Sequence, residues 1–187
     1  MNNLKILLTG VLSLFVTYAS PAQAEVGRKA PGLDGLTTAG PYYNPASKSY
    51  FELFRFSKIT ERPNWQNAQK EAATKFFKNT QGRLATIKNL ETHQFILRNF
   101  KAKDFWIGLQ YYCGSGSLIW VDGTDATKSG FSAWANQWSN TDIRCAAEPY
   151  MPVHYTTKTV TGTLRWRASG ARKFYGMYLV EYPTGKE

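Results

Sequence analysis

Alternating apolar and polar positions predict several short β-strands along this chain. Residues 49–56 alternate Tyr, Phe and Leu with polar residues, and residues 105–110 and 118–121 carry a similar pattern. The last of these runs ends at Asp122-Gly123, a dipeptide typical of tight turns. Further strands are predicted at residues 83–87, 150–157, 163–166 and 177–182.

Two segments that follow the first strand have the spacing of amphipathic helices. Asn64 can cap the first helix and Gly82 marks its far end. Its apolar face is expected to contain Trp65, Ala68, Ala72 and Phe76. Asn89 can cap the second helix. The apolar side of that helix is expected to contain Ile96, Leu97 and Phe100. This order of elements predicts an α+β fold, with the helices segregated from an antiparallel sheet.

Gly108 lies inside the strand predicted at 105–110, where a residue without Cβ weakens a strand unless a neighbour needs the space. We therefore expect another backbone or a ring to approach Gly108 closely. Trp106, Trp120 and Trp134 recur around it at non-helical intervals, which suits strands. Ordinary hairpin strands of another small β-rich domain share these features. The motifs that flank these strands are therefore needed to identify the fold.

The middle of the chain contains a long segment without hydrophobic period. Residues 123–149 are rich in Gly, Ser, Thr, Asn and Asp, and long irregular loops of this kind are usually functional. Residues 25–45 are rich in Gly, Pro, Thr and Ala and are expected to form a lead-in segment. We therefore expect one folded domain at residues 46–184.

The N-terminus has the pattern of a secretory signal peptide. Lys5 precedes an apolar run from Ile6 to Ala19, and Ala22-Gln23-Ala24 follows as a cleavage site, so residues 1–24 are the expected signal peptide. The apolar run is short for a membrane span, which needs roughly 20 residues. We expect a secreted or periplasmic protein without a membrane span.

Charge and cysteine content narrow the expected partners. The chain has 23 basic and 13 acidic residues, a formal net charge of +10. This balance favours polyanions such as acidic polysaccharide, lipopolysaccharide phosphate or anionic lipid, although solubility alone is an alternative explanation. Nucleic acid is not an expected partner of an exported protein. Cys113 and Cys145 are the only cysteines, and in an exported chain we expect them to pair.

Six motifs, in order, resemble the C-type lectin-like domain over Tyr50 to Pro183. They are the Trp65 and Ala68 pair, Leu84-Ala85-Thr86-Ile87, Trp106-Ile107-Gly108-Leu109, Trp120-Val121-Asp122-Gly123, Phe131 to Trp134, and Val180-Glu181-Tyr182-Pro183. The resemblance implies a C-type lectin-like fold, with two helices, small antiparallel sheets and a long irregular loop. It suggests a divergent, exported member of bacterial origin.

The departures from the family pattern concern its disulfides and its calcium ligands. The resemblance places the family's usual disulfide at Ala72 and Val180, where apolar packing is expected instead. Sugar-binding members hold calcium with a Glu-Pro-Asn or Gln-Pro-Asp triplet and a Trp-Asn-Asp motif. The matching residues here are Trp138-Ser139-Asn140 and, after Trp166, Arg167-Ala168. Calcium prefers six to eight oxygen ligands, so we predict no metal and no other cofactor.

The expected ligand site lies in the long loop and the strands after it. Aromatic rings there can stack on sugars, and arginine forks suit carboxylate or phosphate. Glu148-Pro149 resembles half of the calcium triplet. The candidate ligand-binding residues are Trp138, Asn140, Asp142, Glu148, Tyr150, Arg165 and Arg167. Arg144, Arg172 and Lys173 add to the same basic cluster. Core packing of the aromatic residues and a solvated basic face are the alternative interpretations.

No catalytic site is predicted. His93 is expected to be exposed or capping and His154 to have a structural role, although a grouping of Asp142, Glu148 and His154 is conceivable. The sequence therefore favours an exported lectin-like protein that binds a glycan or another anionic ligand without calcium. The alternative is a protein-binding adhesin or interaction module that uses the same loop surface, because a fold does not determine a function.

Overall fold

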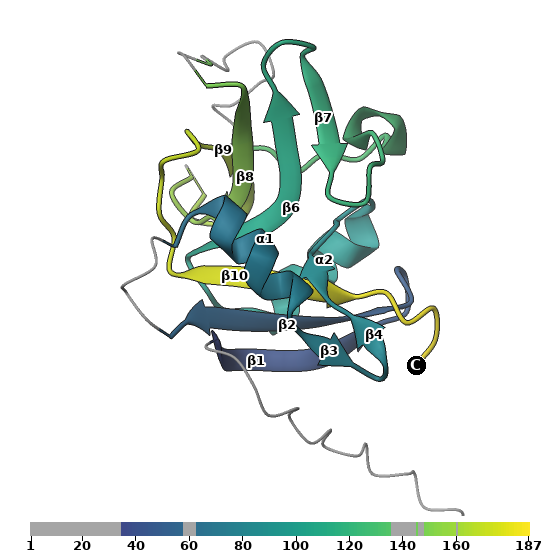
Figure 1. The fold of residues 1–187 in the computed structure, drawn as a ribbon. Helices are drawn as coiled ribbons and strands as arrows, with labels where there is room; N and C mark the ends of the chain where they lie inside the picture. Colours follow the sequence, from purple (N-terminus) through teal and green to yellow (C-terminus); the bar gives the residue numbers. More distant parts are fainter. Residues whose placement is uncertain (1–34, 58–62, 136–144, 146–147, 160) are drawn as a thin grey trace, which may run out of the picture.

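A computed structural model describes residues 35–57, 63–135, 145, 148–159 and 161–187 as an α+β domain (Figure 1). Its main sheet has the strand order β1-β2-β10-β6-β8-β9, with β5 attached to β10 and β7 attached to β6. These strands are β1 (Gly35–Asn44), β2 (Ser49–Phe56), β5 (Arg83–Leu84), β6 (Asp104–Tyr112), β7 (Ser117–Trp120), β8 (Tyr150–Thr156), β9 (Arg165–Ala168) and β10 (Met177–Tyr182). The helices are α1 (Trp65–Ala73), α2 (Leu90–Asn99) and the short 3-10 helix η1 (Ala126–Ser129).

The C-terminal strand β10 joins the two halves of the sheet. It pairs antiparallel with β2 over Met177 to Tyr182, and parallel with β6 through Tyr178 and Trp106. The other pairings in the sheet are antiparallel, so the sheet is mixed at this one junction. Figure 1 shows β1, β2 and β10 lying across one end of the domain, while β6, β7 and β8 extend away from them.

The strand β1 lies within the segment that the sequence pattern places in a lead-in. It pairs with β2 at the edge of the sheet, with register shifts on both sides of Ala39. Gly40-Pro41 is typical of a chain breaker, but an irregular edge strand tolerates Pro. Gly40 has a φ of +98°, and a Cβ there would lie 2.5 Å from the carbonyl oxygen of Phe51. The close approach of β2 therefore explains the glycine.

The first helix is shorter than predicted. Asn64 caps α1 as expected, because its side chain accepts a hydrogen bond of 2.9 Å from the backbone N–H of Asn67. The helix ends at Ala73, and a small hairpin of β3 (Phe76–Phe77) and β4 (Thr80–Gln81) follows. Lys78 and Asn79 connect these strands with positive φ angles, as in a tight two-residue turn. Phe76 is therefore 58% exposed in β3, so the prediction that it lies on the apolar face of the helix is wrong.

The second helix follows the sequence prediction. Asn89 caps α2 and accepts a hydrogen bond of 2.8 Å from the N–H of Thr92. Ile96 and Phe100 are fully buried, and Leu97 packs against the same core while partly buried. Neither helix in the described part of the chain has the length and apolar character that a membrane span requires.

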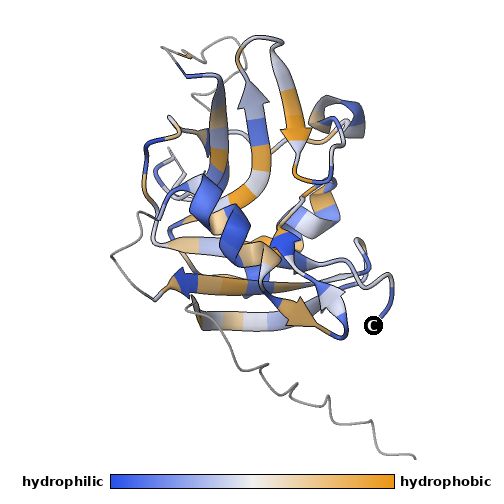
Figure 2. Ribbon diagram, viewed as in Figure 1, coloured by the Kyte–Doolittle hydropathy of each residue, from blue (hydrophilic) through white to orange (hydrophobic). Residues whose placement is uncertain are grey.

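The core consists of two clusters of buried side chains. One contains Trp120, Trp166 and Tyr155, and the other contains Trp65 and Trp106 under α1. Figure 2 shows hydrophobic residues along β6 and β7, whereas the visible face of α1 is largely hydrophilic. Ala72 and Val180 are both fully buried in the second cluster, in agreement with the expectation of apolar packing at these positions.

Gly108 in β6 is packed as closely as the sequence predicts. A Cβ at this position would lie 2.6 Å from the carbonyl oxygen of Leu84 and 2.7 Å from Cγ2 of Val121. The backbone N–H of Gly108 donates to Ala85 at 2.9 Å, and its carbonyl accepts from Val121 at 2.7 Å.

We expect Gly108→Ala to lower the free energy of unfolding by about 1 to 3 kcal/mol, the usual range for overpacking a core. Urea unfolding monitored by tryptophan fluorescence measures this change. Gly114→Ala is the matched control, because a Cβ at Gly114 meets no atom within 4 Å. Equal stability of the two variants would show that Leu84, Ala85 and Val121 move aside at little cost.

Candidate functional site

The structure describes four of the seven predicted ligand-binding residues. Glu148, Tyr150, Arg165 and Arg167 are described, whereas Trp138, Asn140 and Asp142 lie outside the described residues, as does Arg144. The site geometry is therefore built from β8, β9 and the segments that flank them. One of these segments, residues 169–176, connects β9 to β10 and is called the β9–β10 loop.

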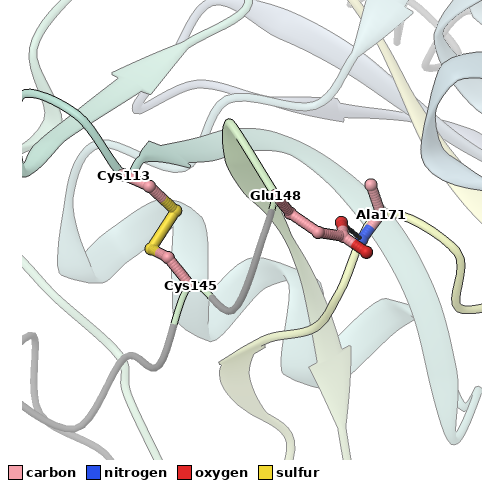
Figure 3. The surroundings of a disulfide bond; sticks show 4 residues. All are labelled: Cys113, Cys145, Glu148 and Ala171. Atoms are coloured by element: carbon pink, nitrogen blue, oxygen red, sulfur yellow. Dashed lines mark hydrogen bonds between the residues drawn. A yellow bond between two sulfur atoms is a disulfide. The ribbon is translucent and has the colours of Figure 1, made fainter.

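The predicted disulfide between Cys113 and Cys145 is present (Figure 3). It joins the residue after β6 to the segment that precedes β8, across a Cα–Cα distance of 5.8 Å. The backbone N–H of Cys113 also donates to the carbonyl of Pro149 at 3.0 Å. Cys145 is thus fixed to the end of β6 by a covalent bond, and Pro149 by a hydrogen bond.

Glu148 contacts the protein backbone. Its Oε2 accepts a hydrogen bond of 2.5 Å from the N–H of Ala171 in the β9–β10 loop, as Figure 3 shows. The carboxylate also lies against Gly170, where a Cβ would be 3.4 Å from Oε1. The backbone N–H of Glu148 donates to the carbonyl of Cys145 at 2.8 Å. Glu148 therefore links the disulfide-bonded segment to the β9–β10 loop.

Tyr150 lies at the start of β8, next to α1. Its hydroxyl accepts a hydrogen bond from Nε2 of Gln66, and burial raises its pKa. Its ring lies 6.2 Å from the ring of Tyr112 and 6.5 Å from that of Trp65, measured between centroids. Tyr112 is partly exposed, so the two tyrosines form a small aromatic surface beside α1.

Arg165 opens β9 and contacts a histidine. Its Nη1 lies 3.0 Å from Nε2 of His93, and Nδ1 of His93 lies 2.7 Å from the hydroxyl of Tyr155. Because arginine only donates, Nε2 must accept and Nδ1 carries the proton toward Tyr155. Burial and the nearby Arg165 charge lower the pKa of His93 to about 4.

The expectation that His93 is exposed or capping is wrong, since it is only 2% exposed. Asn89 is the N-cap of α2, so His93 lies one turn into the helix, on the side that also buries Thr92 and Ile96. There it stacks on Tyr155, with 5.7 Å between ring centroids.

Arg167 is exposed on β9, the last strand of the main sheet. Its neighbour Trp166 is buried and makes edge contacts with Trp120, Phe131 and Trp134. Residues 133–135 bind the backbone of Trp166 from the outer side, through hydrogen bonds of 2.7 and 3.0 Å. Within the described residues, Arg167 forms no ion pair. The alternation of β9 thus buries the tryptophan and presents the arginine to solvent.

His154 lies on β8 opposite Arg167, with which it pairs in register. It is buried, its Nδ1 lies 3.3 Å from Oγ of Ser169, and its ring stacks on Tyr175 at 4.0 Å. Burial and the charge of Arg167 lower the pKa of His154 to about 3. An imidazole that stays neutral over the physiological range and is enclosed by rings fits the predicted structural role.

A family model for the C-type lectin domain matches residues 61–165. The chain belongs to the C-type lectin domain family.

Among curated relatives, the mouse (Mus musculus) low affinity immunoglobulin epsilon Fc receptor is 37% identical over 54 residues, which are 29% of this chain. The chain matches only 15% of the length of that receptor. Because this relative is a mouse protein, the expected bacterial origin has no support from the match. The family membership rests on the lectin domain alone.

Solved structures of C-type lectins share the fold of this domain. The C-type lectin CEL-I from Cucumaria echinata is 20% identical with a TM-score of 0.51, covering 71% of this chain and 89% of that one. The Kupffer cell receptor Clec4f is 22% identical with a TM-score of 0.53, covering 78% and 83%. The Ca²⁺-independent C-type lectin SPL-2 from Saxidomus purpuratus is 15% identical with a TM-score of 0.52, covering 73% and 87%. At these identities the likeness shows the fold alone.

In this C-type lectin domain, the described residues at β9 do not suit calcium. Arg167 brings a positive charge, and Ala168 is buried and has no oxygen in its side chain. The carboxylate of Glu148 is bound by the N–H of Ala171. Across the described ranges, no group of three or more His, Cys, Asp or Glu side chains is placed to hold a metal ion.

The β9–β10 loop of the lectin domain adds residues to the site that the sequence did not single out. Arg172 and Lys173 were expected in the basic cluster, but Phe174 and the anchoring role of Tyr175 were not. All of Arg172, Lys173 and Phe174 are exposed. The contact between Glu148 and Ala171 spans 23 residues of sequence, so no local sequence pattern predicts it.

Proposed function

We propose that this lectin domain belongs to an exported protein and binds an anionic glycan, or another anionic ligand, through Arg167 and without calcium. The observation that carries the proposal is the exposed guanidinium of Arg167 on β9, which forms no ion pair within the described residues. Arginine presents donors in a planar fork that fits carboxylate, sulfate and phosphate groups. The positive charge of Arg167 on β9 therefore attracts an anion and repels a calcium ion.

The surroundings of Arg167 support an anionic ligand. His154 beside it stays neutral, and Arg165 lies two residues earlier on the same strand. The formal net charge of +10 adds an attraction over longer range, which salt weakens. The SPL-2 lectin has this fold and is described as Ca²⁺-independent, so the fold itself does not require calcium.

An array of glycans and polyanions, probed with the purified domain with and without a chelator, tests the proposal. We expect acidic ligands to bind, chelator to have no effect, and Arg167→Ala to lower the affinity for the best ligand about 10- to 100-fold, as for loss of one charge-assisted contact. Titration calorimetry at two salt concentrations measures this loss.

Arg98→Ala is the matched control, because Arg98 is an exposed arginine at the end of α2. Binding that a chelator abolishes would overturn calcium independence. If no glycan or polyanion binds and a protein partner binds tightly, the domain is an adhesin or interaction module instead. N-terminal sequencing of the exported protein tests the expected cleavage after Ala24.

A further inference from the structure

We propose that the β9–β10 loop is a second contact surface for the ligand, so that the ligand is an extended polyanion with repeated charges. In this proposal Glu148 is a positioning residue that holds the loop. The proposal rests on the function inferred above, because it extends the site at Arg167. It identifies the ligand class as an acidic polysaccharide rather than a sugar with a single charge.

The two ends of the β9–β10 loop are anchored to the sheet and to the start of α1. The N–H of Ser169 donates to the carbonyl of Pro152 at 2.9 Å, and the N–H of Tyr175 donates to the carbonyl of Pro63 at 3.1 Å. The hydroxyls of Ser169 and Tyr175 lie 3.1 Å apart, which closes the base of the loop. The ring of Tyr175 also packs against Trp106, with 4.7 Å between centroids.

Contacts within the loop fix its middle. The N–H of Lys173 donates to the carbonyl of Gly170 at 2.9 Å, which forms a turn. The N–H of Ala171 donates to Glu148, and the N–H of Glu148 donates to the carbonyl of the disulfide-bonded Cys145. A loop that is ordered before binding loses less conformational entropy when a ligand arrives.

The exposed part of the loop carries the binding chemistry. Arg172 and Lys173 are exposed and form no ion pair within the described residues, and Phe174 beside them is 48% exposed. Two cations next to an exposed ring suit a chain of acidic sugars, whose charges meet the cations while a CH face meets the ring.

Arg167 and the loop border the same stacked pair of rings, the buried His154 and the partly buried Tyr175. Burial raises the pKa of Tyr175, and the charge of Arg167 acts in the opposite direction, which places this charge near the loop base. Asp104 also acts on Tyr175, and Glu148 is bound to Ala171, so two carboxylates border the region. Among the described residues, neither carboxylate forms an ion pair with Arg167, Arg172 or Lys173. In this proposal Arg167, Arg172 and Lys173 therefore bind the repeated negative charges of one ligand.

The experiment measures binding of dextran sulfate over a series of salt concentrations. For polyanions, the slope of log affinity against log salt falls by roughly one unit for each cation that is removed from the interface, by analogy with nucleic acids. We expect Arg172→Ala combined with Lys173→Ala to reduce the affinity at least about tenfold and the slope by about two. Arg167→Ala should reduce the slope by about one.

The control variant removes two exposed cations at the opposite end of β10. Lys48 and Lys186 lie near the β1–β2 turn and the C-terminus, where the N–H of Gly185 donates to Lys48. Lys48→Asn is chosen because Lys48 has a φ of +51°, which Asn tolerates. Lys48→Asn with Lys186→Ala should change the slope much less than the loop variant.

The positioning role of Glu148 is tested by two substitutions. Glu148→Ala removes the acceptor of the Ala171 N–H, and we expect it to weaken dextran sulfate binding although it removes a repelling charge. Glu148→Gln keeps an acceptor oxygen and should bind at least as well as the parent protein. A simple charge effect predicts tighter binding by both variants and would overturn the positioning role. Thermal unfolding verifies that both variants are folded.

The outcomes separate this proposal from the one on which it rests. If the parent protein does not bind dextran sulfate and no acidic ligand binds on the array, both proposals fail. If binding depends on Arg167 but is unchanged in the Arg172 and Lys173 variant, only the extended site is overturned. If vesicles of anionic phospholipid bind through the loop and dextran sulfate does not, the loop contacts membranes and the polysaccharide assignment is wrong.

Discussion

Replacing Glu181 with alanine is expected to lower the free energy of unfolding by about 3 to 5 kcal/mol, the usual result of breaking a buried charged network. Glu181 is only 2% exposed and lies on β10. Its Oε1 accepts from Oγ of Ser49 at 2.9 Å, and its Oε2 accepts from Thr86 at 3.0 Å through the N–H and at 2.8 Å through the hydroxyl. Arg83 completes the set, with Nε 3.2 Å from Oε2.

The size of this effect comes from the polar groups that the substitution leaves without their acceptor. Ser49 begins β2, whereas Arg83 lies in β5 and Thr86 just after it, and each would lose a partner in or near the core. Urea unfolding of the variant measures the loss. Glu187→Ala is the control, because Glu187 is exposed near the C-terminus, where substitutions usually change stability by less than about 0.5 kcal/mol. A loss below about 1 kcal/mol at Glu181 would show that water or a rearranged Arg83 replaces the carboxylate.

The fold was predictable wherever burial enforces a period on the sequence. The strands β2 and β10 span the predicted residues, although both are buried on both faces along most of their length, and both helix caps lie at the predicted Asn64 and Asn89. Gly108 was identifiable because a glycine inside a buried strand needs a close neighbour, and Leu84 supplies it. Membership of the C-type lectin family agrees with the six motifs, whose residues include those under these packing constraints.

Two parts of the fold depend on contacts that leave no such period. The strand β1 is an edge strand with two register shifts, which allow it to contain Gly40-Pro41. Because this dipeptide is typical of a chain breaker, the sequence did not indicate a strand there. The hairpin of β3 and β4 turns at Lys78-Asn79, which lacks the glycine that usually signals this turn. In both cases the pairing partner, and not the local sequence, determines the structure.

The candidate site was less predictable than the fold. Ligand binding by Glu148 stays a prediction, and the hydrogen bond that its carboxylate accepts from a loop 23 residues later was not foreseen. Arg165 and Arg167 were both candidate ligand-binding residues, but only Arg167 is exposed, because Arg165 reaches His93 on α2. Charge pattern thus identified the basic region, and tertiary contacts assign the separate roles within it.

Acidification from pH 7.5 to pH 5 is expected to lower the free energy of unfolding by about 4 kcal/mol, because two histidines are buried in neutral form. The pKa is lowered from 6.5 to about 4 for His93, by burial and Arg165, and to about 3 for His154, by burial and Arg167. Below pH 6.5 the unfolded chain binds protons at both residues and the folded chain does not. Stability is therefore complete above pH 6.5 and falls as the pH approaches the folded values.

The pH range is chosen so that carboxylates contribute little, since Asp and Glu in unfolded chains titrate near pH 4. Urea unfolding at several pH values measures the dependence. His93→Gln combined with His154→Gln removes both titrating groups, so the double variant should lose less than about 1 kcal/mol over the same range, even if its stability at pH 7.5 is lower. A similar loss in the parent protein and the double variant would mean that other groups cause the acid sensitivity. Because His93 binds Arg165 and His154 lies beside Arg167, protonation of either histidine would also place a second positive charge next to a site arginine.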